Sequence, residues 1–214
     1  MNAPTLEHIQ QALALTQFDH ESAWQRMAPR PPTFRRMPGR GGPTRAAGVL
    51  LLLYPHEGEL AFVLTRRTDT VASHKGQVSL PGGAVEPGDE GPVDAALRET
   101  CEELAVCRDD IAVLGALTPL YVIVSDFEIY PTVGYVDARP EFRPQPSEVA
   151  AVIEVPLAAL LDSQVKVEER WMIGDVERDV PFYRLDGQVV WGATAIILSE
   201  FEQRLRAALQ TGAG

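Results

Sequence analysis

The sequence predicts an α/β protein in which helices cover a mixed β-sheet, forming an α/β/α sandwich. Several apolar runs have the length of a strand and are separated by turn residues, and the few helical segments do not alternate regularly with them. The chain has 214 residues, of which 45% are hydrophobic and 23% are charged, in ordinary globular proportion. It is therefore long enough to bury the core of one domain.

The first part of the chain differs in composition from the rest, so we expect a lead-in at 1–45 and the main domain at 46–214. Residues 4–16 predict a short amphipathic helix. Residues 28–45 are rich in Pro, Gly and Arg and predict a linker. The arginines of this region are Arg26, Arg30, Arg35, Arg36, Arg40 and Arg45. They either form a solvated arm or reach a substrate phosphate, since guanidinium groups suit phosphate oxygens.

The main domain opens with two apolar runs, 46–54 and 60–65, which we expect to pair as a hairpin. The sequence Pro55-His56-Glu57-Gly58 between them is typical of a turn. Further strands are predicted at 110–120, 127–137, 149–155, 166–171 and 182–190. A short helix is predicted at 156–161 and a longer terminal helix at 193–209.

An acidic helix carries the main chemical signal. Glu99, Glu102 and Glu103 are spaced so that they lie on one stripe of a helix. The opposite, core-facing side is predicted to hold Val93, Ala96, Leu97, Thr100, Cys101 and Leu104. Like charges one turn apart repel, and a hard divalent cation such as Mg²⁺ would neutralise them. The alternative is a solvated acidic face without a ligand.

The residues just before this helix favour the metal site. Gly82 and Gly83 end a Leu-Pro-Gly-Gly turn, where glycine permits unusual backbone angles or the close approach of a ligand. Glu90 precedes Gly91-Pro92, a plausible helix start because proline is tolerated in the first turn. Together these residues predict a compact, oxygen-rich site that suits a metal ion carrying a diphosphate.

From Gly83 to Val106 the chain reads GAVEPGDEGPVDAALRETCEELAV, which resembles the box of the Nudix hydrolases, G-x(5)-E-x(7)-R-E-U-x-E-E-x-G-U with U aliphatic. The Arg-Glu pair, the Glu-Glu pair and the final valine match, and seven residues separate Glu90 from Arg98. Six residues instead of five separate Gly83 from Glu90, and Thr100 replaces an aliphatic residue. Ala105 replaces the late glycine, which predicts a helix end that avoids positive φ.

A second set of matches is similar to the coenzyme A pyrophosphatases of that family. It consists of Leu64-Thr65-Arg66-Arg67, Gly76, Leu80-Pro81-Gly82-Gly83, Pro146-Ser147-Glu148-Val149, Glu154-Val155-Pro156-Leu157 and Trp191-Gly192-Ala193-Thr194-Ala195. This resemblance implies the Nudix fold and hydrolysis of coenzyme A to 3′,5′-ADP and 4′-phosphopantetheine. Alternatives are a pyrophosphatase for ADP-ribose or NADH, and a non-catalytic nucleotide sensor. The related isoprenoid isomerases would need a cysteine in the site, and Cys101 lies on the wrong helix face.

The resemblance also implies roles for individual residues. Glu99 and Glu103 are expected to bind Mg²⁺ or Mn²⁺ directly, with Glu102 as a third ligand or as a base acting through water. Gly83 would offer its carbonyl to the metal, and Glu90 would lie at the edge of the cluster. Arg98 is expected to hold a carboxylate in place, because its fork binds two oxygens.

Other candidate residues lie outside the box. Glu148, before the strand at 149–155, is the alternative general base, or else a surface glutamate. The candidates for binding the substrate are Arg66, Arg67, His74, Lys75 and Gly82. The plainer interpretation of these cations is solvation of a strand end. Trp191 is interpreted as a core aromatic residue in preference to a base-stacking platform.

The bulk properties exclude several classes of protein. A formal net charge of −11 argues against a general binder of nucleic acid or of anionic membranes. The first thirty residues do not resemble a signal peptide, and no apolar run has transmembrane length. We therefore expect a cytoplasmic enzyme with a small-molecule substrate, with a homodimer left open. Cys101 and Cys107 are interpreted as small core hydrophobes and not as a disulfide framework.

Overall fold

The computed structural model describes residues 3–31, 44–68 and 76–211. Its helices are α1 (Leu6–Leu13), α2 (His20–Gln25), α3 (Pro92–Leu104), α4 (Leu157–Leu160) and α5 (Gly192–Thr211). Its strands are β1 (Arg45–His56), β2 (Glu59–Arg67), β3 (Val78–Ser79), β4 (Gly82–Ala84), β5 (Ala112–Ala116), β6 (Leu120–Val122), β7 (Phe127–Tyr135), β8 (Val149–Pro156), β9 (Lys166–Ile173), β10 (Val176–Leu185) and β11 (Gln188–Val190). Two short 3₁₀ turns, Arg108–Asp110 and Ser163–Val165, complete the described elements.

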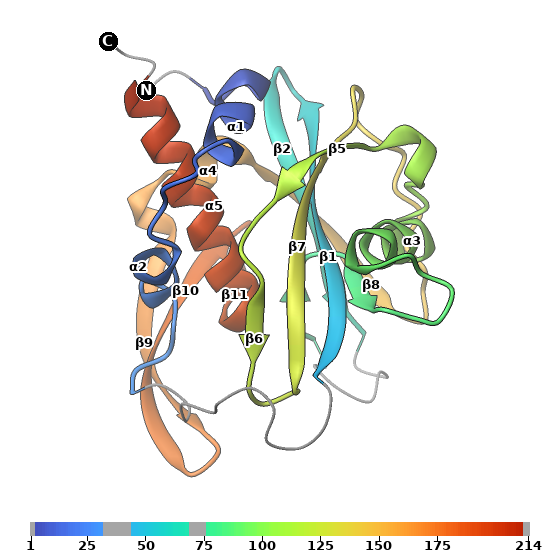
Figure 1. Ribbon diagram of the computed structural model, residues 1–214. Helices are drawn as coiled ribbons and strands as arrows, with labels where there is room; N and C mark the ends of the chain where they lie inside the picture. The colour runs from blue at the N-terminus through green and yellow to red at the C-terminus, as the bar shows by residue number, and fades with distance from the viewer. Residues whose placement is uncertain (1–2, 32–43, 69–75, 212–214) are drawn as a thin grey trace.

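The larger sheet is mixed. Its strands follow the order β3-β2-β1-β7-β5, with β4 on β1, β6 on β7 and β8 on β2. Strands β1 and β7 are parallel, whereas the other described pairs are antiparallel. Helix α3 covers one face, and α5 with α1 and α2 covers the other (Figure 1). The predicted α/β sandwich around a mixed sheet is thus confirmed.

The alternation of side chains along β1 explains why the sheet is covered on both faces. Leu50, Leu52 and Tyr54 pack in the core beneath α3, whereas Leu51 and Leu53 pack in the core beneath α5. All five side chains are fully buried. A strand buried on both faces appears as a continuous apolar run, which is how this segment stands out in the sequence.

The predicted hairpin is confirmed between β1 and β2. Glu57 and Gly58 form its two-residue turn, with φ of 51° and 86°. Positive φ at both positions matches the twist of the flanking strands. Pro55 lies within β1, opposite Leu60, so the strand continues past the predicted end.

Other boundaries required correction. The strand predicted at 110–120 divides into β5 and β6, and the strand predicted at 182–190 contains the turn between β10 and β11. Asp186 and Gly187 form that turn with φ of 47° and 72°. Helix α2, whose start is capped by Asp19 accepting from the Ser22 N–H, was not predicted, and neither were β3 and β4. Helix α1 is shorter than the predicted 4–16.

Buried polar contacts join the N-terminal helices to the domain. Glu200 on α5 is buried and accepts hydrogen bonds from Trp24 Nε1 at 3.0 Å and from the Thr118 hydroxyl at 2.8 Å. Arg30 pairs with Glu168, and the Arg45 guanidinium lies over the Phe127 ring. Arg30 and Arg45 are thus engaged in contacts within the protein. Arg35, Arg36 and Arg40 lie outside the described residues.

A smaller antiparallel sheet has the order β11-β10-β9. The half-buried Trp191 follows β11, and its ring meets the Trp171 ring edge to face at 5.5 Å. In the described part of the chain, no helix has both the length and the apolar character needed to cross a membrane.

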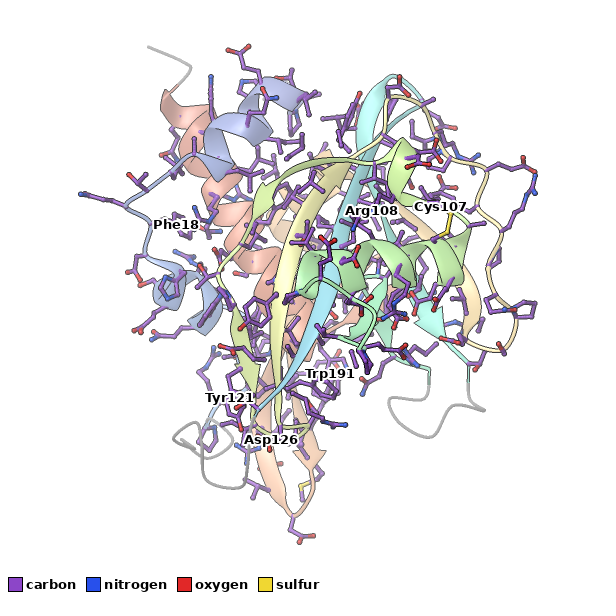
Figure 2. The ribbon with its side chains drawn as sticks, turned by 45° about the vertical axis from the view of Figure 1, so that its right-hand side comes forward. Phe18, Cys107, Arg108, Tyr121, Asp126 and Trp191 are labelled. Atoms are coloured by element: carbon purple, nitrogen blue, oxygen red, sulfur yellow. A yellow bond between two sulfur atoms is a disulfide. The ribbon has the colours of Figure 1, made fainter. Side chains whose placement is uncertain are left out.

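Helix α3 and its C-terminal end differ from the sequence analysis in three ways. Cys101 and Cys107 form a disulfide, so their interpretation as unpaired core residues is wrong (Figure 2). Ala105 closes the helix with φ of 58° and ψ of 31°, although its side chain predicted an end without positive φ. Val93 is 42% exposed and does not face the core. Of the other residues predicted to face the core, four are buried and Cys101 is half-buried; the buried ones are Ala96, Leu97, Thr100 and Leu104.

Candidate active site and metal centre

Helix α3 lies directly on the sheet because glycine occupies the contact. A Cβ at Gly48 on β1 would lie 1.8 Å from the Pro92 carbonyl oxygen, so only glycine permits this approach. The helix starts at Pro92, after Gly91, as the sequence predicted. Strand β4 pairs with β1 at Gly83↔Gly48, which brings the Gly82-Gly83 turn beside the middle of α3.

Three carboxylates converge at this place. Glu99, Glu103 and Glu148 each contribute an oxygen, and these oxygens all lie within 4.8 Å of one another. Glu103 is only 3% exposed, and the other two are half-buried. The predicted helix stripe therefore meets a glutamate from a distant part of the sequence. Carboxylate oxygens in such a group are suitable ligands for Mg²⁺ or Mn²⁺.

The electrostatics of the group indicate that it suits a cation. Burial is the main cause that raises the pKa of Glu103 to about 8, and Glu99 and Glu148 add to the rise, whereas Arg67 opposes it. Burial also raises the pKa of Glu99, against the effect of Arg98. Among the described residues, Glu103 Oε2 is buried and has no hydrogen-bond partner. A divalent ion would satisfy that oxygen and neutralise the group.

The two glycines of β4 leave room for this arrangement. Gly82 has φ of 146°, and a Cβ there would lie 2.3 Å from the Gly48 carbonyl oxygen. Its main chain also donates a hydrogen bond to the Glu103 carboxylate, which lowers the pKa of that group. A Cβ at Gly83 would lie 2.4 Å from Glu99 Oε1. Gly82 is therefore required by its close contact with the β1 backbone, whereas Gly83 leaves room for the Glu99 carboxylate.

Arg98 organises the exposed side of the group. Its guanidinium forms a two-pronged contact with Asp89, with Nε to Oδ1 at 2.9 Å and the terminal nitrogen to Oδ2 at 3.1 Å. The other terminal nitrogen donates to Glu99 at 3.0 Å and to Glu102 at 3.2 Å. Arg98 thus holds carboxylates, as the sequence analysis expected.

Asp89 is the site residue that sequence reasoning missed. The side-chain hydrogen bond from Arg98 is the main cause that lowers the pKa of its carboxyl. Five residues separate Gly83 from Asp89, as in the box, whereas seven residues separate Glu90 from Arg98. The structure places Asp89 against Arg98 and leaves Glu90 exposed, outside the carboxylate group. The spacing counted from Gly83 is thus the sequence signal that could have identified Asp89.

The other predicted residues are placed as follows. Glu102 lies on the same helix stripe but is 59% exposed, outside the group formed by Glu99, Glu103 and Glu148. Arg67 places a terminal nitrogen 3.9 Å from Glu103 Oε1, and its Nε is buried without a partner among the described residues. Arg66, by contrast, is exposed. His74 and Lys75 lie outside the described residues.

Glu148 arrives on a segment that crosses the end of α3. The Gln145 N–H donates to the Glu103 main-chain carbonyl at 2.9 Å, and the Arg143 N–H donates to that of Leu104 at 3.0 Å. These bonds satisfy carbonyls that a helix end leaves unpaired. The segment is therefore fixed to the same helix turn that carries Glu103.

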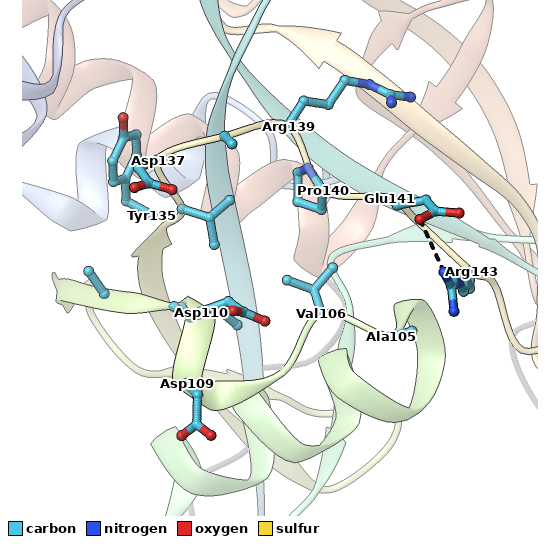
Figure 3. A pocket seen from close by; sticks show the side chains of 14 residues that line it. Ala105, Val106, Asp109, Asp110, Tyr135, Asp137, Arg139, Pro140, Glu141 and Arg143 are labelled. Carbon is cyan, nitrogen blue, oxygen red and sulfur yellow. Dashed lines mark hydrogen bonds and ion pairs between the residues drawn. The ribbon is translucent and has the colours of Figure 1, made fainter.

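One large hollow lies away from the carboxylates. It has a volume of about 930 Å³ and lies beyond the end of α3 (Figure 3). Tyr135, Asp137 and Arg139 contribute to its lining, as do the paired Glu141 and Arg143. None of Glu99, Glu103 and Glu148 lines it, so this hollow is separate from the carboxylate group.

Comparisons with known proteins agree with this geometry. The NUDIX domain family matches residues 43–173. An uncharacterized Nudix hydrolase NudL of Pectobacterium atrosepticum is 36% identical over 161 residues, covering 73% of this chain and 80% of the relative. A NudL protein of Yersinia pestis is 35% identical over 152 residues, covering 69% and 73%.

Solved structures show the same fold. The Nudix hydrolase RenU of M. Smegmatis has a TM-score of 0.52 at 18% identity, covering 78% of this chain and 87% of that one. The MutT protein of Methanosarcina mazei has a TM-score of 0.50 at 16% identity, covering 81% and 99%. Nudix hydrolases act on small-molecule diphosphates and generally use divalent metals such as Mg²⁺ or Mn²⁺. The chain belongs to the Nudix family and is a hydrolase that acts on diphosphate bonds.

Proposed function

We propose that this hydrolase cleaves the diphosphate of coenzyme A or its derivatives to give 3′,5′-ADP and 4′-phosphopantetheine. The observation that carries the proposal is the position of Arg67 beside Glu103 and Gly82. Arg67 and Gly82 both belong to the upstream sequence pattern that is similar to the coenzyme A pyrophosphatases. The same pattern therefore supplies a cation and a close-packed turn at the carboxylate group.

Glu99, Glu103 and Glu148 would hold Mg²⁺ or Mn²⁺, with the Gly83 carbonyl as a further proposed ligand. The fit rests on the convergence of three carboxylates and on the buried, unpartnered Glu103 Oε2. When bound, the metal supplies charge neutralisation of the diphosphate and lowers the pKa of a bound water. We propose no direct metal contact for the exposed Glu90.

The protein side chains bind and orient the substrate. The Arg67 side chain is partly exposed beside Glu103, and its guanidinium fork suits phosphate geometry. Gly82 lets the main chain approach the same phosphates. Arg66, His74 and Lys75 remain predictions for more distant phosphate groups. Arg98 keeps Glu99 and Glu102 in fixed orientations.

In the reaction, water attacks one phosphorus and the bridging P–O bond breaks, so that each product keeps one phosphate of the cleaved diphosphate, and 3′,5′-ADP also carries the 3′-phosphate of coenzyme A. A carboxylate accepts the proton released by the water. Glu102 and Glu148 are the two candidates for this base, so that Glu148 is proposed either as a metal ligand or as the base. Glu102→Gln and Glu148→Gln distinguish the two candidates. Loss of the base removes the fall of kcat on the acidic side of its pH profile. Loss of a metal ligand instead weakens the activation of the enzyme by the metal.

The function is tested by incubating the purified protein with coenzyme A, ADP-ribose, NADH and diadenosine polyphosphates, with and without Mg²⁺ or Mn²⁺. Mass spectrometry identifies the products. Metal-dependent release of 3′,5′-ADP from coenzyme A, well above cleavage of the others, is the expected result. Preference for ADP-ribose or NADH would replace the proposed substrate by another nucleoside diphosphate derivative. Ligand binding without any cleavage would instead favour the sensor alternative.

We also propose a cytoplasmic location, on the grounds of the expected substrate. Thiol systems keep cytosolic cysteines reduced, so Cys101 and Cys107 are expected to be dithiols in the cell and to pair on oxidation. Alkylation of intact cells followed by mass spectrometry measures their state. The homodimer remains a prediction, and light scattering of the purified chain measures it.

A further inference from the structure

Thr68 holds the main chain on both sides of Glu148. Its N–H donates to the Glu148 carbonyl at 3.0 Å, and its hydroxyl donates to the Ser147 carbonyl at 3.0 Å. These two carbonyls flank the Cα of Glu148. Thr68, directly after β2, therefore binds the peptide groups on both sides of the Glu148 Cα.

The local backbone makes such an anchor necessary. Residues 136–148 form no helix or strand, so the place of Glu148 over α3 depends on individual hydrogen bonds. On the helix side, Gln145 donates to the Glu103 carbonyl, and the Glu148 N–H donates to the Gln145 carbonyl at 3.0 Å. Thr68 supplies the opposing attachment. Glu148 is thus held between β2 and the turn of α3 that carries Glu103.

A break in the β2–β8 ladder brings Thr68 to this position. The pairing changes from Arg66↔Ala151 to Arg67↔Val149, so that Ala150 is the extra residue of a bulge. A bulge bends its strand and changes the direction of the neighbouring side chains. Here the consecutive residues Arg67 and Thr68 reach Glu103 and the Glu148 backbone respectively.

We propose that Thr68 is a positioning residue that sets the Glu148 carboxylate relative to Glu99 and Glu103. The proposal rests on the proposed role of these three glutamates in metal-dependent hydrolysis. Catalytic groups are sensitive to small displacements, and a shift of about 1 Å can lower the rate by up to about a hundredfold. The Thr68 hydroxyl matters here through its hydrogen bond and not through its volume.

Two matched substitutions separate these properties. Thr68→Val keeps the shape but removes the hydroxyl donor, and we expect it to lower kcat for coenzyme A at least about tenfold with KM changed less than about twofold. Thr68→Ser keeps the donor and should retain kcat within about twofold. Equal losses in both variants, or full kcat in Thr68→Val, would overturn the proposal. Thr68→Ala replaces Thr68→Val if the latter does not fold.

A double-mutant cycle tests whether Thr68 acts through Glu148. In a Glu148→Gln background, Thr68→Val should lower kcat by less than about a further twofold, because the positioned group is already lost. An undiminished further loss in that background would show that Thr68 acts elsewhere. Thermal unfolding of each variant confirms that the fold is retained.

Mn²⁺ binding without substrate separates this proposal from the proposed function. Titration calorimetry of the purified protein should give weaker Mn²⁺ binding for Thr68→Val and unchanged binding for Thr68→Ser. If the wild type cleaves no coenzyme A but shows this pattern, the substrate assignment fails and the role of Thr68 stands. Equal Mn²⁺ affinity in wild type and Thr68→Val would refute the positioning role, whatever the substrate.

Discussion

Arg98 and Asp89 form a two-pronged ion pair at 2.9 and 3.1 Å, on the side of Arg98 opposite to Glu99. The Asp89 side chain is only 3% exposed. Its own turn is closed by the Glu86 N–H, which donates to Asp89 Oδ2 at 2.7 Å. The loop between β4 and α3 therefore fixes the arginine that orients the metal-site carboxylates.

Asp89→Asn is expected to lower kcat at least about tenfold, because a neutral amide cannot pair with both Arg98 nitrogens and Glu99 loses its fixed orientation. Glu90→Gln is the matched control, since this neighbouring side chain is exposed. It should keep kcat within about twofold. Steady-state kinetics of both variants measure the contrast. A larger loss of kcat in Glu90→Gln than in Asp89→Asn would show that Glu90, and not Asp89, is the functional residue of this loop.

Glu103→Gln should leave the fold intact and lower turnover by orders of magnitude, because the buried carboxylate is the proposed charge partner of the metal. The amide retains the size of the side chain and can still accept a hydrogen bond from Gly82. Circular dichroism establishes the fold, and product release at saturating Mg²⁺ measures turnover. Near-normal activity would reject the helix stripe as the metal site.

Stability without metal is expected to fall as pH rises towards 8. The pKa of Glu103 is raised from 4.5 to about 8, so between these values the folded state binds more protons than the unfolded state. Unfolding then becomes easier as pH increases through this window. Added Mg²⁺ should give a stabilisation that grows with pH, because the metal competes with the proton.

Thermal unfolding between pH 5 and 8.5, with and without Mg²⁺, measures this dependence. In Glu103→Gln the decline with pH should be shallower and the Mg²⁺ effect weaker. The same decline in wild type and variant would mean that another group controls it.

The helix stripe could be predicted because a helix places positions i, i+3 and i+4 on one side, whatever surrounds it. Gly82 and Gly83 stood out because two adjacent glycines between apolar segments indicate a close approach. Glu148 was found from its place before a strand. Each of these signals is local, and it is the fold that brings Glu99, Glu103 and Glu148 together.

Residues whose role depends on tertiary pairing were missed. Thr68 contacts the main chain on both sides of Glu148 beside a bulge, through its hydroxyl and its N–H, and nothing in its own sequence neighbourhood specifies that register. Asp89 was passed over because two ways of counting the box disagreed by one residue. The Cys101–Cys107 pair was missed because apolar burial and a disulfide across a helix end both place cysteine at these positions.

Ala105→Gly should stabilise the protein by about 1 kcal/mol, because Ala105 adopts left-handed angles that cost a residue with a Cβ roughly that much. Its N–H closes the helix by donating to the Cys101 carbonyl at 2.9 Å, a bond that glycine preserves. Gly174→Ala is the reverse control, since Gly174 has φ of 61° and open space around its Cα. It should destabilise by a similar amount. Urea unfolding with the disulfide intact measures both changes, and destabilisation by Ala105→Gly would show that contacts of the alanine methyl group outweigh its backbone strain.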